Sequence, residues 1–422
     1  MLRYARNDIE AERIVATKQS PTARRRLLRY ARNDIEAERS VATKPSPTAR
    51  RRLFRYARSD IEGERCVTTD QAEPRIVDWP WPFSQADLAA GLRRFYKDPT
   101  IWIQEVKPLS LAHVRPSIGR IRGAVVAYEG QQTAGTCRLI VKEPRGTTRT
   151  GLAGAGRREV GVYRYLASEI PVDFPSMISA SEAGDWMIME EITPVRAPEA
   201  WEAEDYKRAI RSLVVLHDRF WGLSEDLAAF PWLSRPLDAD FEVHVAAAAN
   251  SLERVVDQGR LSNWPDRVHT IAHLILNAEK VIEPLKHEPS TLLHGDYWPG
   301  NISVLGDGRQ VVYDWQMAAV GPPILDIVAF VLKSEWWFGE LPLSRDEITQ
   351  EYRKHLAALS GKEWDEATWT ELWDHALMWR FLQEWMDLLA ASPTTLLQTR
   401  AELLERVWFD PLGEAVTRRL LS

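Results

Sequence analysis

The most informative part of the chain reads LLHGDYWPGN at residues 292–301 and VVYDW at residues 311–315. Each stretch begins with an apolar run that favours a short strand. A Gly-Asp-Gly turn at residues 306–308 is suited to join a strand at residues 302–305 to one at residues 310–313 as a hairpin. Asn301 then lies at the start of one strand and Asp314 at the end of its antiparallel partner. Because such positions are adjacent across a hairpin, we expect both side chains to converge on one point.

These residue types suit phosphoryl transfer, in which the protein mainly positions the reactants and neutralises charge. The carboxylate of Asp314 can bridge Mg²⁺ to nucleotide phosphates, and Asn301 can hold a second metal ion through its amide oxygen without adding negative charge. Asp296 lies on the loop between the apolar run at residues 292–293 and the hairpin, where it can accept the proton of an incoming hydroxyl group. We therefore predict that Asp296 is a catalytic base and that Asn301 and Asp314 are metal ligands.

The spacing His-Gly-Asp-x-x-x-x-Asn from His294, followed by Asp-Trp after a strand, resembles the aminoglycoside phosphotransferase and choline kinase family. That family is related to protein kinases, whose corresponding signatures are His-Arg-Asp-x-x-x-x-Asn and Asp-Phe-Gly. The resemblance implies a catalytic base at Asp296 and metal ligands at Asn301 and Asp314. It also implies that His294 supports the loop, and that Asp326, which closes a Gly-Pro-Pro-Ile-Leu-Asp motif, braces it.

A lysine and a glutamate in the preceding part of the chain extend the resemblance. Lys142 ends an apolar run, and Glu159 follows 17 residues later on a predicted helix. On that helix Glu159 shares a face with Tyr163 and Leu166, and a carboxylate on an apolar face needs a partner if it is buried. We expect Lys142 to be that partner, and the pair to hold the nucleotide phosphates.

Residues 187–192 (MIMEEI) resemble the hinge that meets the adenine in this family. Glu190 and Ile192 are therefore predicted nucleotide contacts, made by backbone N–H and C=O groups. The alternative is an edge strand that leaves the sheet.

The nucleotide phosphate loop departs from the family pattern. A turn at residues 117–123 precedes the predicted strand at 124–129, but it has two glycines and no G-x-G-x-x-G motif. Arg120 and Arg122 either touch phosphate or are ordinary surface arginines. His217, on an apolar predicted helix, is expected to be a core histidine.

Residues 1–75 differ in kind from the rest of the chain. Residues 2–27 recur as residues 28–53 with two differences, and a third copy begins at residue 54 and fades. A solenoid conserves its apolar face and varies elsewhere, whereas here nearly every position repeats, which indicates a tandem duplication. We expect a loosely ordered basic extension without a catalytic role. A basic arm that binds an acidic partner is the alternative.

The remaining chain is predicted to be α+β, with a bilobal fold like that of the protein kinases. Residues 76–190 form the N-lobe, a small antiparallel sheet with one key helix. Residues 191–422 form a large, mainly helical C-lobe with the catalytic loop and acceptor site. Ser84 and Asp87 resemble a capping box that opens a helix reaching Tyr96.

Charge and hydropathy narrow the function further. Residues 1–70 carry 17 Lys and Arg against 10 Asp and Glu, whereas residues 71–422 carry 37 against 50. An acidic body argues against nucleic acid as the substrate, because binding a nucleic acid requires a positive face. No apolar run reaches the roughly 18 residues of a membrane span, so we expect a cytoplasmic protein.

The sequence predicts a small-molecule kinase that uses Mg²⁺ and ATP or GTP and has a hydroxyl acceptor. Five tryptophans could form a cage for a quaternary amine, but core packing is their more common use: Trp336, Trp337, Trp373, Trp379 and Trp385. Four acidic residues could instead grip an aminosugar: Glu335, Glu340, Asp374 and Glu384. A nucleotide-binding protein without transfer activity and a protein kinase are the other possible functions. The oligomeric state stays open.

Overall fold

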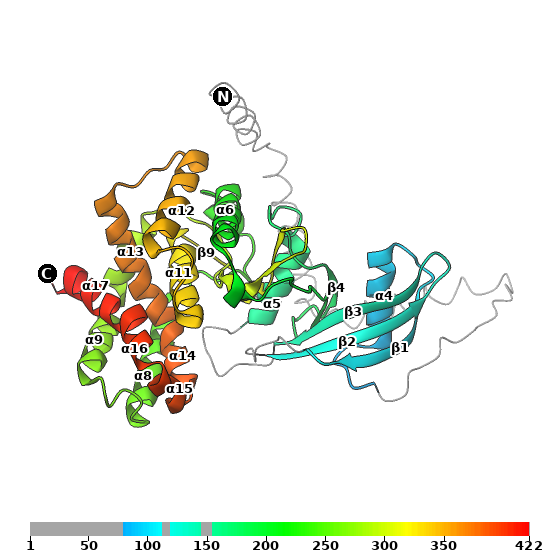
Figure 1. Cartoon of the computed structure of the whole chain (residues 1–422), viewed down its shortest axis with the longest axis horizontal. Helices are drawn as coiled ribbons and strands as arrows, with labels where there is room; N and C mark the ends of the chain where they lie inside the picture. Colours follow the sequence, from blue (N-terminus) through cyan, green and yellow to red (C-terminus); the bar gives the residue numbers. More distant parts are fainter. Residues whose placement is uncertain (1–78, 112–118, 145–153, 422) are drawn as a thin grey trace, which may run out of the picture.

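The structure is a computed structural model that describes residues 79–111, 119–144 and 154–421. A strand-rich part and a larger helical part lie side by side (Figure 1). The repeats, and the whole extension predicted for residues 1–75, lie outside the described residues. Their arrangement therefore stays a prediction.

The strand-rich part is an antiparallel sheet of five strands in the order β1-β2-β3-β5-β4. The strands are β1 (Trp102–Leu109), β2 (Arg120–Glu129), β3 (Ala134–Glu143), β4 (Met177–Ala180) and β5 (Met187–Glu190). Side chains alternate between the two faces of a strand, and in β2 the buried positions Ala124, Val126 and Tyr128 follow that period of two. They face a separate apolar core of the N-lobe.

Helix α4 (Gln85–Tyr96) covers one face of this sheet and confirms the predicted capping box. The Ser84 hydroxyl accepts a hydrogen bond from the Asp87 N–H at 3.1 Å, and the Asp87 carboxylate accepts one from the Ser84 N–H at 2.9 Å. The buried residues Leu88 and Leu92 lie one turn apart and enter the N-lobe core. The local sequence therefore determines both the start of the helix and its inner face.

The predicted phosphate turn is placed differently by the structure. Residues 112–118 lie outside the described part, and Arg120 already belongs to β2, where Gly123 pairs with Ile140. The prediction of a turn through residue 123 is thus wrong, because four more residues pair with β3. The side chain of Arg122 is also committed: it lies 2.8 Å from Glu143 and 4.5 Å from the ring centre of Trp81.

The key helix of the N-lobe packs against the helical part. It runs as α5 (Ala155–Gly161) and continues as a π-helical turn, η2 (Val162–Leu166). A Cβ on Gly161 would lie 2.5 Å from the ring of Trp232, so only glycine allows this approach. Residues of the helix share one apolar core with the C-lobe. The helix that carries Glu159 is therefore positioned by both lobes.

The helical part surrounds a large apolar core. Before the catalytic region come η3 (Pro198–Ala200), α6 (Ala203–Arg219), α7 (Ser224–Leu227), α8 (Phe241–Asp257), α9 (Pro265–Leu276) and α10 (Ala278–Lys286). After it come α11 (Ile324–Phe338), α12 (Arg345–Ser360), α13 (Glu366–Arg380), η6 (Phe381–Trp385), α14 (Met386–Ala391), α15 (Thr394–Thr399), α16 (Ala401–Leu404), η7 (Glu405–Phe409) and α17 (Asp410–Leu420).

Two short antiparallel pairs frame the catalytic region. β6 (Thr291–Leu293) pairs with β9 (Ala319–Gly321), and β7 (Ile302–Val304) pairs with β8 (Gln310–Val312) as the predicted hairpin. Short 3₁₀ turns, η4 (Pro299–Asn301) and η5 (Trp315–Met317), stand beside β7 and β9. The observed architecture confirms the predicted α+β, kinase-like bilobal fold.

Candidate active site

The loop between β6 and β7 is anchored by Asp326, in the first turn of α11. Its two carboxylate oxygens accept hydrogen bonds from the N–H of His294 at 2.7 Å and of Gly295 at 2.9 Å. Gly295 has φ +78°, and a Cβ there would lie 2.0 Å from the carbonyl oxygen of Met317, so the turn requires glycine. The buried carboxylate of Asp326 thus satisfies two backbone donors of the loop.

His217 and Tyr352 extend this anchor into the core. His217 Nε2 lies 3.3 Å from Asp326 Oδ2, and Nδ1 lies 2.7 Å from the Tyr352 hydroxyl oxygen. Burial acts to raise the pKa of Asp326, but His217 outweighs burial and holds that pKa below its usual value. His217 is buried as predicted for a core histidine, yet it also supports the loop through Asp326.

His294 supports the loop from within. Its Nδ1 accepts a hydrogen bond from the Asp296 N–H at 3.2 Å, so the proton of the ring belongs on Nε2, 3.2 Å from the carbonyl oxygen of Tyr313. Burial lowers the pKa of His294 to about 4, which keeps the ring neutral near pH 7. The ring therefore links the catalytic loop to the strand end before Asp314.

Asp296 is held at both carboxylate oxygens. The Asn301 amide nitrogen donates to Asp296 Oδ2 at 2.9 Å and to the Asp296 carbonyl oxygen at 2.9 Å. The Lys333 ammonium, from α11, forms an ion pair with Oδ1. Burial raises the pKa of Asp296 to about 6, although Lys333 opposes that shift. A carboxylate with a pKa closer to neutrality is a better proton acceptor.

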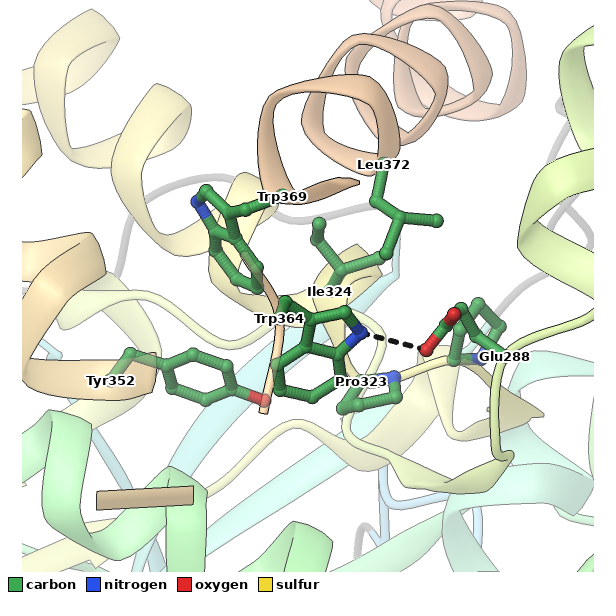
Figure 2. A pocket seen from close by; sticks show the side chains of 8 residues that line it. Glu288, Pro323, Ile324, Tyr352, Trp364, Trp369 and Leu372 are labelled. Carbon is green, nitrogen blue, oxygen red and sulfur yellow. Dashed lines mark hydrogen bonds between the residues drawn. The ribbon is translucent and has the colours of Figure 1, made fainter. Parts of the chain in front are cut away.

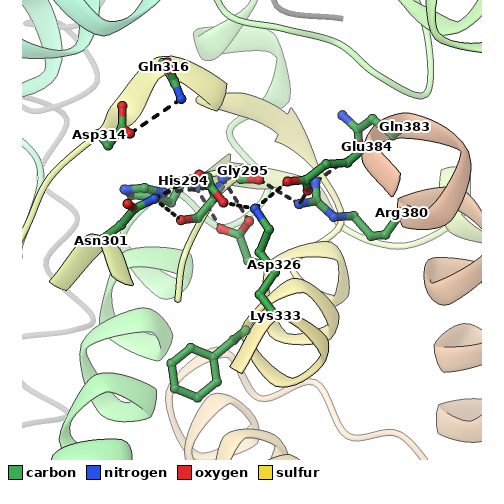
Figure 3. Close-up of polar contacts among 12 residues, drawn as sticks. His294, Gly295, Asn301, Asp314, Gln316, Asp326, Lys333, Arg380, Gln383 and Glu384 are labelled. Atoms are coloured by element: carbon green, nitrogen blue, oxygen red, sulfur yellow. Dashed lines mark hydrogen bonds and ion pairs between the residues drawn. The ribbon is translucent and has the colours of Figure 1, made fainter. Parts of the chain in front are cut away.

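Lys333, Glu384 and Arg380 were not predicted as a cluster around the base. Lys333 also forms an ion pair with Glu384, and Glu384 Oε2 lies 2.7 Å from Arg380 Nη2. Arg380 further donates to the Gly295 carbonyl oxygen at 2.9 Å. Figure 3 shows Lys333 rising from α11 between the loop and the helix that carries Arg380 and Glu384. We call these three residues and Asp296 the base cluster.

The sequence held one signal for this cluster. Lys333 follows Asp326 by seven positions on a helix that is otherwise apolar until Ser334, so the two charges share a face. A charged residue on an apolar helix face requires a partner. Which partners Lys333 would find could not be read from the chain, because Glu384 lies 51 residues further on.

Lys142 lies between two carboxylates on the other side of the site. Its ammonium nitrogen is 2.7 Å from Glu159 Oε1, 2.8 Å from Glu159 Oε2 and 2.7 Å from Asp314 Oδ1. Burial disfavours the charged form, but Asp314 and Glu159 outweigh it and raise the pKa of Lys142. The structure therefore brings together the predicted Lys142 and Glu159 and adds Asp314; we call the three the cleft cluster.

Asp314 and Asn301 have the chemistry of a Mg²⁺ site. Asp314 adopts φ +70°, a left-handed conformation that aspartate tolerates better than most residues, and its Oδ2 has only a long contact, 3.5 Å, with Gln316 Nε2. In the described ranges, no hydrogen bond engages Asn301 Oδ1, since the amide nitrogen makes the contacts with Asp296. An oxygen from each residue is thus suited to a hard cation.

The predicted hinge residues differ in what they offer. The Glu190 N–H donates to the Ser176 carbonyl oxygen at 3.0 Å, and its side chain accepts from the Ser176 N–H at 2.7 Å. Ile192 is half-buried, and within the described part of the chain no backbone hydrogen bond engages it. The backbone of Ile192 is therefore the better placed of the two to meet a nucleotide base.

The possible acceptor-binding residues are largely committed elsewhere. Trp336, Trp379 and Trp385 are at most 1% exposed and belong to the C-lobe core, as expected for core tryptophans. Three of the four acids contact arginines: Glu335 with Arg345, Asp374 with Arg418 and Arg419, and Glu384 with Arg380. Glu340 is exposed. Neither an open tryptophan cage nor a free acidic patch is formed by these residues.

A small, mainly apolar hollow lies at the start of α11. Figure 2 shows Pro323, Tyr352 and Trp364 among its lining, together with Glu288, whose carboxylate accepts a hydrogen bond from Trp364 Nε1 at 2.8 Å. None of its lining residues belongs to the base cluster or the cleft cluster.

Comparison with known proteins gives the family. The sequence model described as "Phosphotransferase enzyme family" matches residues 126–367. The solved structure of an ethanolamine kinase from Plasmodium vivax has a TM-score of 0.50 at 11% identity, covering 88% of this chain and 98% of that chain. A choline kinase from Streptococcus pneumoniae has a TM-score of 0.44 at 12% identity, covering 76% and 94%. No curated protein sequence matches this chain.

Proposed function

The chain belongs to the phosphotransferase enzyme family, and on that premise we propose that it transfers the terminal phosphate of a nucleoside triphosphate to a hydroxyl group of a small molecule, with Asp296 as the base. One observation carries this proposal: Asn301 donates directly to Asp296 through its amide nitrogen and keeps its amide oxygen for a metal ion. The proposed proton acceptor and a proposed metal ligand are thereby held next to each other, as in-line transfer requires.

In the proposed reaction, each residue has one task. Asp296 accepts the acceptor's hydroxyl proton while the acceptor oxygen forms a bond to the terminal phosphorus. The bond from that phosphorus to the bridging oxygen breaks, and the nucleoside diphosphate leaves. Lys142, oriented by Glu159, holds the phosphates. Asp314 and Asn301 would hold Mg²⁺, which would supply the positive charge that neutralises the phosphates.

The nucleotide base is proposed to meet the backbone at residues 190–192. Within the described residues no backbone hydrogen bond engages Ile192, which supports this position, and its N–H and C=O offer one donor and one acceptor to a base. Both ATP and GTP are therefore candidate donors. A cytoplasmic location stays a prediction of the sequence. In the part of the chain that the structure covers, no helix has the length and apolar character to cross a membrane.

The acceptor is proposed to lie beside the aromatic wall next to the base. Trp298 stacks on Trp337 and Phe338, with ring centres 6.1 and 5.8 Å apart, and all three are half-buried. The base cluster contains two carboxylates and two cations, so it offers no excess negative charge to a polyamine. These contacts favour a neutral acceptor with a ring, such as a sugar, over a polycationic one.

Two other functions would give different results in the test described below. A nucleotide-binding protein without transfer activity would bind Mg²⁺ and ATP but consume none. A protein kinase would phosphorylate a polypeptide; Asp-Trp at residues 314–315 replaces Asp-Phe-Gly, which argues against that function.

The test measures Mg²⁺-dependent consumption of ATP and GTP with a panel of aminoglycosides, choline-like amines, sugars and hydroxylated lipophiles. Asp296→Asn is the test variant. Asp307→Asn is its matched control, because Asp307 lies on the nearby hairpin turn and contacts Arg309 only at the surface. We expect one acceptor class to stimulate consumption, and Asp296→Asn to abolish it while nucleotide binding persists. Normal turnover in Asp296→Asn would contradict the assigned base.

A further inference from the structure

One face of α11 supports the catalytic loop at three levels. Asp326, in the first turn, binds two backbone N–H groups of the loop. Lys333, two turns later, reaches Asp296, and Trp337, one turn beyond, stacks on Trp298. Positions separated by 7 and 11 residues share a helix face. The position of the loop, its base and its aromatic wall therefore depends on this helix.

Lys333 is buried and committed to the base. The residue is 5% exposed, and its ammonium contacts Asp296 and Glu384 while lying 5.9 Å from the ring centre of Trp298. A buried ammonium is costly unless it is paired. Burial disfavours its charge, but Asp296 and Glu384 outweigh burial and raise the pKa of Lys333, so the group stays positive.

Resting on the proposed function, we propose that Lys333 is a positioning residue for the base: its ammonium orients the Asp296 carboxylate and provides the positive charge that balances transfer. Before transfer, Lys333 is shared by Asp296 and Glu384. When Asp296 takes the acceptor's proton it becomes neutral, and Glu384 is still held by Arg380 at 2.7 Å. Lys333 then keeps Glu384 as its carboxylate partner, and the base cluster gains one net positive charge next to the base while the phosphoryl group is transferred.

A simpler role is that Lys333 only neutralises the buried Glu384. The two roles are separated by removing both charges. In Lys333→Met/Glu384→Gln, the positive charge near the base is lost, while no carboxylate of the pair is left without its partner. If Lys333 served only Glu384, this double variant would keep the kcat of the wild type, and any loss of stability would come from Arg380, which loses its carboxylate partner Glu384.

The experiment compares Lys333→Met, Lys333→Arg and the double variant with wild type, using the acceptor that most stimulates ATP consumption, or water if none does. Lys354→Met is the matched control, because Lys354 is exposed on α12. The readouts are kcat, KM for ATP, binding of a fluorescent ADP analogue and the thermal midpoint. We expect Lys333→Met to lower kcat about 100-fold, a typical contribution of proton transfer by a positioned group, with ADP binding changed less than threefold. Lys333→Arg should recover about tenfold of the loss, since guanidinium also pairs with carboxylate.

The outcomes divide cleanly. A double variant that regains thermal stability but keeps the low kcat supports the proposal. A double variant that regains the wild-type kcat overturns it. A kcat of Lys333→Met within threefold of the wild-type value also overturns it. Should Lys333→Met not fold, the double variant carries the test. Asp296→Asn in the same assay separates the role of Lys333 from the proposed function. If Asp296→Asn loses turnover and Lys333→Met does not, only the role of Lys333 is contradicted. If Asp296→Asn keeps turnover, the proposed base fails as well.

Discussion

The cleft cluster and the base cluster have a similar arrangement of charged residues but a different net charge. In each, one lysine lies between two carboxylates: the partly buried Lys142 between Glu159 and Asp314, and the buried Lys333 between Asp296 and Glu384. The base cluster also contains Arg380, which contacts Glu384 at 2.7 Å. Counting formal charges, the cleft cluster is negative by one and the base cluster is neutral.

Arg380 accounts for this difference in charge. A cluster with an excess carboxylate attracts a divalent cation, whereas a neutral cluster has no need of one. This difference in charge favours the proposal that Asp314 is a Mg²⁺ ligand and that Asp296 is a proton acceptor.

Removal of Mg²⁺ should have the largest effect. With excess EDTA we expect ATP consumption to fall to background, because the phosphates lose the cation that neutralises them. The thermal midpoint without nucleotide should hardly move, since Lys142 already pairs the carboxylates of the cleft cluster. A large drop in that midpoint would show that the cleft cluster needs a metal ion in order to fold.

Asp314→Asn makes the cleft cluster neutral. We expect a loss of about 10³-fold in kcat, since metal stabilisation of developing charge amounts to several kcal/mol. Steady-state kinetics across a Mg²⁺ titration measures this loss of kcat. Asp307→Asn, the same substitution at the surface, is the control. A change below tenfold would remove Asp314 from the metal site.

Arg380→Met gives the base cluster an excess negative charge. Arg380 is 2% exposed and contacts both Glu384 and the Gly295 carbonyl oxygen. Breaking a buried ion pair on one side costs about 3–5 kcal/mol, so urea denaturation should report a loss of that size. Arg380→Met/Glu384→Gln restores neutrality and should recover part of it. If the double variant is no more stable than the single one, charge balance is not what Arg380 provides.

Gln316→Ala should have the smallest effect. Its side chain approaches Asp314 only at 3.5 Å, which is too long for a strong hydrogen bond. We expect kcat and the Mg²⁺ requirement to change less than threefold in the same titration. A larger change would mean that Gln316 orients Asp314 when metal and nucleotide are bound.

The predicted family and the kinase-like fold are confirmed, and the family is one of phosphotransferases, the enzyme class that was predicted. These predictions rested on residues that lie close together in the sequence. Examples are the capping box at Ser84, the hairpin around residues 306–308 and the spacing from His294 to Asn301. The extent of β2 was predicted too short, because pairing with β3 overrides the turn preference of Gly123. The catalytic roles of the site residues stay predictions.

By itself the sequence determined which residue types could perform phosphoryl transfer and in what order they occur. Tertiary structure decided which charges meet. Lys333 reaches Asp296 across 37 positions, and Glu384 and Arg380 complete the cluster from a helix still further along the chain. Each charge was visible in the sequence, but its partner was not, since only the packing of α11 and α13 beneath the loop brings buried charges within pairing distance.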